Sequence, residues 1–418
     1  MRLQRKYALL KYYERNQQKS QTKFMKTGYS IRTWRMRLVC PEPIWLARTE
    51  EYFQNVVEFY YHLLRQHEEL WNSSLFDIQR SLELLTLTGR DGRQPTNPLP
   101  MGKVPVYLRR AAINKASATV KSTQELQSGF PEKLEAKVTF FKGMYSDLTD
   151  RSICLKLWNG EKWIWTDCNL KGRPFPQDGQ LMSPTLVKEG RRYLLNIPVK
   201  QENSDARTAK ERMAEGTNLC SVRFTNTDTF AVCCILDEQG NQLAVHTCRG
   251  GDAYRHRCKL LETRIQKSRP NTVGDNSPQP NRKYYMHLKN LSEHYAHQVS
   301  REILNFCKEN QAGIIVLPDY DQNFTRMAMV KSGNFSPLHL SSKIRTNLQY
   351  KAWAEGILVL ETRTDGLKDK CAICGGRVRR KGNEFLCENG HQGNRFLNDA
   401  RNLGRKCQDS FFRRSRTK

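Results

Sequence analysis

The stretch NLCSVRFTNTDTFAVCCILDEQGNQLAV, residues 218–245, decides the fold of the C-terminal half. Its two short apolar runs, at 219–224 and 229–236, are bounded by turn-forming residues, and a second turn at 238–241 leads into QLAV (242–245). Runs of this length between turn signals are typical of strands that lie inside a sheet. The stretch therefore predicts a β-hairpin with a further strand before it.

The residues that follow predict that this hairpin is part of an α/β sheet. Two helical stretches and two more apolar strand-like runs come next, at 254–267, 282–310, 312–320 and 356–362. Strands that alternate with long helices favour an α/β fold. We therefore assign 218–366 to an α/β domain, preceded by a polar linker at 201–217.

The N-terminal half predicts a small β-barrel or sandwich interrupted by helices. An alternating strand pattern begins in SIRTWRMRLV, so residues 1–46 are expected to form a basic arm and the first barrel strand. Apolar residues then recur at helical spacing, which predicts a helical insertion at 47–130. Strand patterns separated by turns resume at 131–200 and are expected to complete the barrel.

The composition describes a folded and strongly basic chain. The 418 residues carry 69 Lys and Arg against 42 Asp and Glu, a formal net charge of +27. This excess favours a polyanionic partner, nucleic acid before a membrane surface, because neutralised phosphates release counterions. No long uncharged apolar window and no apolar signal-peptide core occur, so we expect a cytoplasmic protein without a membrane partner.

Basic residues in three predicted elements are candidates for contact with phosphate groups. A charge run is usually a solvated face, and the run Arg377, Arg379, Arg380 and Lys381 has that interpretation. The candidates are Arg32 and Arg35 in the first strand, Arg109, Arg110, Lys115 and Lys121 in the helix VYLRRAAINKASATVKS (106–122), and Arg255 and Arg257 in the first long helix of the α/β domain.

One group of residues has the spacing of metal ligands. Cys371 and Cys374 form a C-x2-C pair, and Cys387 and His391 follow after a spacer of twelve residues. Zinc prefers four thiolate or imidazole ligands in a tetrahedron, so the pattern predicts a structural zinc site with no open position for water. Cys407 is the alternative to His391 as the fourth ligand.

With its parts in this order, the chain resembles the TnpB proteins of insertion sequences and the compact type V CRISPR effectors derived from them. The hairpin at 229–241, AGIIVLPDY (312–320), GILVLETRTDGLKDKCAICGG (356–376) and FLNDARNLGRK (396–406) carry the resemblance. It implies an RuvC-like (RNase H-like) domain with an inserted zinc ribbon at 367–394 and a closing helix and basic tail at 395–418. A wedge-type β-barrel carrying a helical recognition insertion would precede this domain.

The resemblance also implies where three carboxylates would stand, because cleavage by two divalent metals needs acids to hold them. The first position, seven residues before Ala231, falls on Phe224, with Arg223 beside it. The second falls on Pro318 and the third on Phe396. None of these can hold magnesium, which implies a nuclease-inactive member.

Nearby acids leave an alternative open. Asp228, Asp319 and Asp399 would form a displaced triad. A step of one residue along a strand turns the side chain of Asp319 to the other face, whereas Asp399 lies one helical turn from Phe396 and could face the same way.

The expected function is RNA-guided DNA binding without cleavage. A guide RNA would select a target double-stranded DNA next to a short flanking motif, in the bacterial cytosol or nucleoid, for transcriptional repression or for recruitment of a partner such as a transposition machinery. The alternatives are an active guided endonuclease that uses the displaced triad and a guide-independent zinc-ribbon protein that binds nucleic acid.

Overall fold

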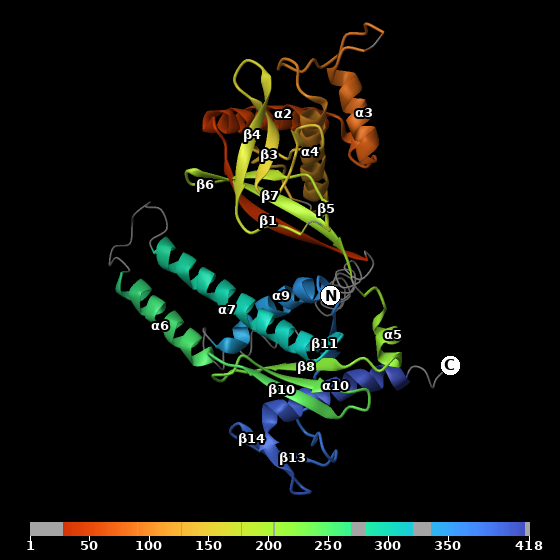
Figure 1. Cartoon of the computed structure of the whole chain (residues 1–418), viewed down its shortest axis with the longest axis vertical. Helices are drawn as coiled ribbons and strands as arrows, with labels where there is room; N and C mark the ends of the chain where they lie inside the picture. Colours follow the sequence, from red (N-terminus) through yellow and green to blue (C-terminus); the bar gives the residue numbers. More distant parts are fainter. Residues whose placement is uncertain are drawn as a thin grey trace, which may run out of the picture. The chain divides into compact units, whose positions relative to one another are not determined.

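The computed structural model describes residues 28–413 except 90, 127, 177, 204, 269–280 and 321–335. The chain divides into two compact units, an N-terminal unit of residues 31–201 and a C-terminal unit of residues 202–418 with the first 30 residues (Figure 1). Most of the expected basic arm, the loop at 269–280 and the basic tail from 414 lie outside the described residues.

Three α-helices and a short 3-10 helix lie between the first and second strands of the N-terminal unit. They are α2 (Pro43–Gln66), η1 (Glu68–Leu70), α3 (Leu75–Thr86) and α4 (Val106–Leu126). The sequence reasoning did not single out α3, although Ser74 caps it by accepting a hydrogen bond from the Asp77 amide, and Ile78 and Leu82 turn inward from it.

The strands of the N-terminal unit form one antiparallel sheet of seven. They are β1 (Tyr29–Val39), β2 (Tyr145–Ser146), β3 (Ser152–Trp158), β4 (Trp163–Lys171), β5 (Gln180–Leu181), β6 (Thr185–Glu189) and β7 (Arg192–Glu202). The order is β2-β3-β4-β1-β7-β5, with β6 also paired to β7. The described pairings do not join β2 to β5, so the sheet that the sequence predicted as a barrel or sandwich is an open half-barrel.

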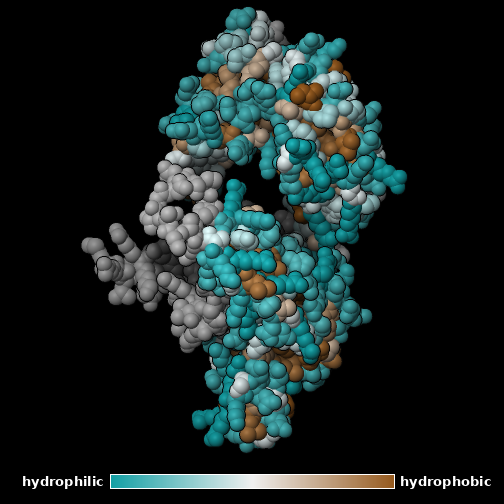
Figure 2. Space-filling model, turned by 90° about the vertical axis from the view of Figure 1, so that its left-hand side faces the viewer, coloured by the Kyte–Doolittle hydropathy of each residue, from teal (hydrophilic) through white to brown (hydrophobic). Residues whose placement is uncertain are grey.

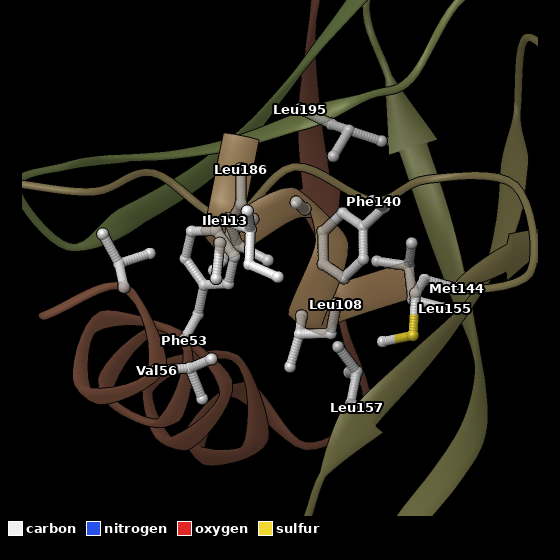
Figure 3. Close-up of a cluster of buried hydrophobic side chains, with 14 of the residues drawn as sticks. Phe53, Val56, Leu108, Ile113, Phe140, Met144, Leu155, Leu157, Leu186 and Leu195 are labelled. Atoms are coloured by element: carbon white, nitrogen blue, oxygen red, sulfur yellow. The ribbon is translucent and has the colours of Figure 1, made fainter. Parts of the chain in front are cut away.

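The core of the N-terminal unit lies between this sheet and α2 and α4. Figure 3 shows Phe53 of α2 pointing toward Ile113 of α4, and Leu108 of α4 pointing toward Leu157 of β3. The side chains of β3 alternate between buried and half-buried, as expected for a sheet with one covered face. The helices are thus part of the unit's single core.

The C-terminal unit contains the α/β sheet that the sequence predicted. Its strands are β8 (Leu219–Phe224), β9 (Ala231–Leu236), β10 (Gln242–Cys248), β11 (Ile314–Asp319) and β12 (Leu358–Arg363), in the order β10-β9-β8-β11-β12. The first three strands are antiparallel, while β11 runs parallel to both β8 and β12.

Helices cover both faces of this sheet. One face packs against α6 (Gly251–Lys267), α7 (Arg282–Glu309), η2 (Pro337–Leu340) and α9 (Ser341–Trp353), and the other against α10 (Arg395–Arg413) (Figure 1). Val222 of β8 faces the first group, whereas Leu219 faces α10. A Cβ on Gly404 would lie 2.5 Å from Leu236 Cδ1, so α10 approaches the sheet closely because it carries a glycine there.

The segment expected to be a linker contains a packed helix, α5 (Ala209–Ala214). Thr208 and Glu211 form a capping box at its start. The fully buried guanidinium of Arg212 donates hydrogen bonds to the carbonyls of Gly313 (2.7 Å) and Gly356 (2.6 Å). These contacts fix α5 to the starts of β11 and β12, which sequence patterning did not reveal.

A small three-stranded sheet lies between β12 and α10. It consists of β13 (Val378–Lys381), β14 (Glu384–Cys387) and β15 (Gln392–Asn394). The surface of the molecule in the view of Figure 2 is mostly hydrophilic, with scattered apolar patches. None of the described helices combines the length and the apolar character needed to span a lipid bilayer.

Candidate functional site

The four predicted metal ligands come together in the small three-stranded sheet. The donor atoms of Cys371, Cys374, Cys387 and His391 all lie within 4.8 Å of one another. Cys387 Sγ is 3.6 Å from Cys374 Sγ and 3.4 Å from His391 Nδ1. Two thiolates on one tetrahedral zinc, with bonds near 2.3 Å, are about 3.8 Å apart. The donor set and its spacing therefore fit a four-coordinate metal.

Backbone and side-chain donors surround these sulfurs. Gly375 has a φ of +76°, which lets the chain turn back so that its amide bonds the Cys371 carbonyl. The amide of Asn389 donates to Cys387 Sγ (3.2 Å), and its side chain donates to Cys374 Sγ (3.3 Å). This side-chain bond is the main cause that lowers the pKa of Cys374 to about 6, toward the thiolate that a metal binds.

Cys407, the alternative fourth ligand, is not part of this cluster. It lies on α10 in the core with Leu219 and Leu403, and burial raises the pKa of its thiol. An apolar environment favours the neutral thiol, which is a poor ligand. His391 is therefore the fourth donor.

Two asparagines of α10 hold the metal cluster against the α/β sheet. Asn398 Oδ1 accepts from the Ala372 amide (2.8 Å), and its Nδ2 donates to the Lys370 carbonyl (2.9 Å). Asn402 Nδ2 also donates to Lys370 (2.8 Å). Both residues belong to the motif that resembled a closing helix, but sequence reasoning gave them no such role.

A second group of possible ligands, His246, Cys248 and Glu302, lies between β10 and α7. His246 Nε2 is 2.6 Å from Glu302 Oε1. Ligands on one zinc with bonds near 2.0–2.1 Å are about 3.3 Å apart, so this pair is a direct hydrogen bond. We interpret the group as a contact between a strand and a helix.

The three positions inferred for lost carboxylates are the last residue of β8, the next-to-last residue of β11 and the second residue of α10. Phe224 is buried on the α6–α7 face of the sheet, in the core with Tyr320. Arg223 lies on the α10 face, because successive side chains of a strand point to opposite faces. Arg223 is therefore the residue of β8 that meets α10, and Phe224 faces the other side of the sheet. Pro318 and Phe396 are both buried.

Asp399 is the acid that α10 presents at this place, and two arginines hold it. Arg223 Nε lies 3.3 Å from Asp399 Oδ2, and Arg380 of β13 donates to Asp399 Oδ1 at 2.5 Å. The side chain of Asp399 is only 2% exposed. Arg223 also donates to the Tyr320 hydroxyl (2.8 Å). Both oxygens of this carboxylate are therefore engaged by guanidinium groups of the protein itself.

The displaced triad does not assemble. Asp228 is exposed and accepts a hydrogen bond from the Asp252 amide at the start of α6 (3.0 Å). Asp319 is exposed at the end of β11, whereas Asp399 is buried in its ion pairs. Among the described residues, these three acids form no group whose oxygens could share a metal.

The two strongest phosphate candidates share one acid partner. Arg109 is buried and donates to Glu83 Oε1 (3.0 Å) and to the Val104 carbonyl. Arg110 also pairs with Glu83 (3.2 Å), but its side chain is 44% exposed. The prediction for Arg109 is wrong, because its guanidinium faces into the N-terminal unit, between α3 and α4. A period-3.6 pattern alone did not show which arginine turns inward.

The other basic candidates differ in how they are placed. Arg35 pairs with Glu189, Lys121 donates to the Ser73 carbonyl, and Arg255 donates to the Asn226 carbonyl. Lys115 and Arg257 are exposed, and Arg32 is half-buried. Arg257 lines a shallow cavity of about 450 Å³ between α6 and α7, together with Arg264 and His287, which the sequence did not single out.

A known family model matches only the N-terminal unit of the chain. Residues 30–159, the first part of the N-terminal unit, match the family model described as the Aq_aa04 family. No curated protein matches the sequence. The family model covers less than half of the chain.

Solved structures resemble the chain over most of its length. A Cas12f1 structure in complex with sgRNA and target DNA has a TM-score of 0.53 at 12% identity, over 86% of this chain and 81% of that one. The mini-RNA-guided endonuclease Cas_phi3 gives 0.49 at 9% identity, over 90% and 92%. C2c1 of Alicyclobacillus acidoterrestris with single-guide RNA gives 0.47 at 10%, over 86% and 70%. The match to the Cas12f1 structure shows that the chain has a fold like that of the TnpB proteins and compact type V effectors.

Proposed function

We propose that this protein is an RNA-guided DNA-binding protein that does not cut its target. The fold shared with an effector that was solved with sgRNA and target DNA supports a guided role. The net charge of +27 supports a nucleic-acid partner. The guide would supply sequence selection by base pairing, and the protein would contact backbone and a short flanking motif.

Each unit has a role in this proposal. The C-terminal unit is an RuvC-like domain, and its small three-stranded sheet is a zinc ribbon that holds one structural zinc on the four donors of the metal cluster. The N-terminal unit is a wedge-type half-barrel with a helical recognition insertion. Its exposed basic residues, Arg110 and Lys115, contact phosphates.

The observation that carries the lack of cleavage is the set of residues where β8, β11 and α10 meet. Arg223, Pro318 and Phe396 contribute no carboxylate, and Asp399 is saturated by two guanidinium groups. Hydrolysis with two metals needs carboxylates that hold the ions a few ångströms apart, so that one can activate water. With a single acid already neutralised, this place supports binding alone. Occupancy of a DNA site would then block transcription or recruit a partner such as a transposition machinery.

The guided role is tested by sequencing the RNA that copurifies with the full chain and measuring DNA binding with and without it. A defined RNA species that confers binding on complementary duplex supports the proposal. Equal binding of duplex after the RNA is removed would favour the guide-independent alternative.

The lack of cleavage is tested on the same complex with Mg²⁺ or Mn²⁺, using single- and double-stranded targets. We expect bound target and no product. Metal-dependent nicking that disappears in Asp319→Ala would overturn the inactive reading and support the displaced triad. Because Asp319 is exposed, this variant is expected to keep its fold.

A further inference from the structure

Three guanidinium groups gather around a single carboxylate at the start of α10. Arg223 and Arg380 contact Asp399 directly, and Arg395 begins the helix. The guanidinium carbon of Arg395 lies 4.6 Å from the centroid of the Phe396 ring. Its Nε is buried and has no hydrogen-bond partner among the described residues. We call these four residues, Arg223, Arg380, Arg395 and Asp399, the arginine site.

The formal charge of the arginine site is +2, from three guanidinium groups and one carboxylate. Three carboxylates with two divalent metals would give +1, from +4 and −3. The two arrangements have the same sign, although one uses bound ions and the other uses side chains. Burial and then repulsion from Arg380 lower the pKa of Arg395, while the nearby carboxylate of Asp399 opposes this shift.

The arginine side chains of this site are more exposed to solvent than its carboxylate. The side chains of Arg380 and Arg223 are 21% and 11% exposed, whereas that of Asp399 is 2% exposed. Arg380 Nε already donates to the Lys368 carbonyl (2.9 Å) and Arg223 Nη1 to the Tyr320 hydroxyl (2.8 Å), so an approaching anion would meet only the exposed remainder of these two arginines, in front of the carboxylate. The first amides of α10 already bond Asn394 Oδ1, so the side chains and not the helix terminus would hold the anion.

We propose that the arginine site binds a phosphodiester of a single nucleic-acid strand without any divalent metal. Guanidinium groups present paired N–H donors that match the oxygens of a phosphate, and they bear a charge that does not depend on metal supply. They do not lower the pKa of water as a bound metal does, so the strand is held and not hydrolysed. The strand's identity rests on the proposed function, but the phosphate chemistry does not.

The test uses neighbouring residues that differ in the face they occupy. Arg380 of β13 belongs to the arginine site, and Arg379 is exposed on the other face of the same strand. Removal of either charge changes the net charge equally. Binding of a fluorescein-labelled twelve-nucleotide oligo(dT) to the full chain, without guide, is measured by anisotropy in EDTA and in Mg²⁺. Oligo(rU) of the same length distinguishes a DNA strand from an RNA strand.

We expect equal affinity in EDTA and Mg²⁺ for the wild type, a loss of about tenfold in Arg380→Gln, and at most about twofold in Arg379→Gln. Arg395→Gln is the second variant, and because Arg395 makes no ion pair with Asp399 it is expected to lose affinity while keeping the wild-type melting temperature. Equal losses in Arg380→Gln and Arg379→Gln, or binding that requires Mg²⁺, would overturn the proposal. Since no guide is used, the result is independent of whether guided binding is found.

Discussion

The metal cluster and the arginine site both contact α10 but have opposite charge character. The cluster is a set of electron-pair donors, and the arginine site is a set of cationic side chains. In the cluster, three thiols and an imidazole converge at a spacing that a metal requires. At the arginine site, the acid Asp399 is instead paired with the guanidinium groups of Arg223 and Arg380. The donors of one part of the C-terminal unit could share an external cation, whereas the carboxylate of the other part already has cationic partners within the protein.

This difference follows from what each kind of site contributes to folding. A structural metal supplies folding free energy to a segment with almost no apolar core, and here the ribbon core is only Cys371, Phe385 and Cys387 with Val378 beside them. A set of unpaired acids instead costs stability through mutual repulsion. Pairing of Asp399 with two arginines avoids this cost, while loss of a cysteine from the metal cluster would destabilise the small sheet that carries it.

The largest effect is expected from Cys374→Ser, which deletes a ligand of the cluster. We expect loss of stoichiometric zinc and unfolding of the ribbon, because apparent zinc-binding energies of small domains are roughly 10–16 kcal/mol. Metal analysis and thermal melting of the full chain measure it. Cys407→Ser is the matched control, since it changes a buried cysteine outside the cluster and should retain one zinc per chain. Loss of zinc in Cys407→Ser as well would contradict the assignment of His391 as the fourth ligand.

Asp399→Asn is expected to have the next largest effect, a destabilisation of about 3–5 kcal/mol. The change leaves Arg223 and Arg380 close together and partly buried without their anion. In a metal-binding carboxylate site, the same change would relieve repulsion and raise stability. Denaturant unfolding of the variant and of Asp319→Asn, whose side chain is exposed, separates the two cases. An Asp399→Asn protein that is more stable than the wild type would contradict the stabilising role given to the pairs of Asp399 with Arg223 and Arg380.

Asn398→Ala tests the joint between the two regions. The variant leaves the buried Ala372 amide without its acceptor, and we expect a loss of about 2 kcal/mol with zinc content unchanged. Asn402→Ala removes bonds to carbonyls only and should cost about 1 kcal/mol. Equal effects of the two changes in denaturant unfolding would contradict the role given to Asn398.

The smallest effect is expected from Asp205, a partly exposed carboxylate that pairs with the exposed Arg207 and with the buried Arg212, whose guanidinium also donates to backbone carbonyls. The hydrogen bond from Arg207 is the main cause that lowers its pKa to about 2, and Arg212 adds to it. A lowered pKa means that the stabilisation is complete above pH 4 and disappears as the pH falls toward 2. Melting of wild type and Asp205→Asn should therefore differ by about 1 kcal/mol or less at pH 6 and converge near pH 2.

The elements of the sheet and the four metal donors could be predicted because local patterns specify them. Short apolar runs between turns gave β8, β9, β11 and β12, and ligand spacing gave the ribbon. Counting along the sequence did not show that Arg223 and not Phe224 is the residue of β8 that meets α10. The burial of Arg109 and the pairing of Arg223 with Asp399 depend on residues 26 and 176 positions away. No local pattern carries such information, and α9 was missed because its polar and apolar residues show little segregation.

Because Asn398 and Asn402 bond the segment that carries the metal cluster to α10, we expect local unfolding of the cluster and of α10 to be coupled. Amides that open together exchange with solvent deuterium at a common rate. Chelation of the ribbon metal would then accelerate exchange in the first turns of α10, including the turn that carries Asp399, before it affects β9 or β10. A metal ion bound at the metal cluster would in this way determine how long the arginine site stays assembled.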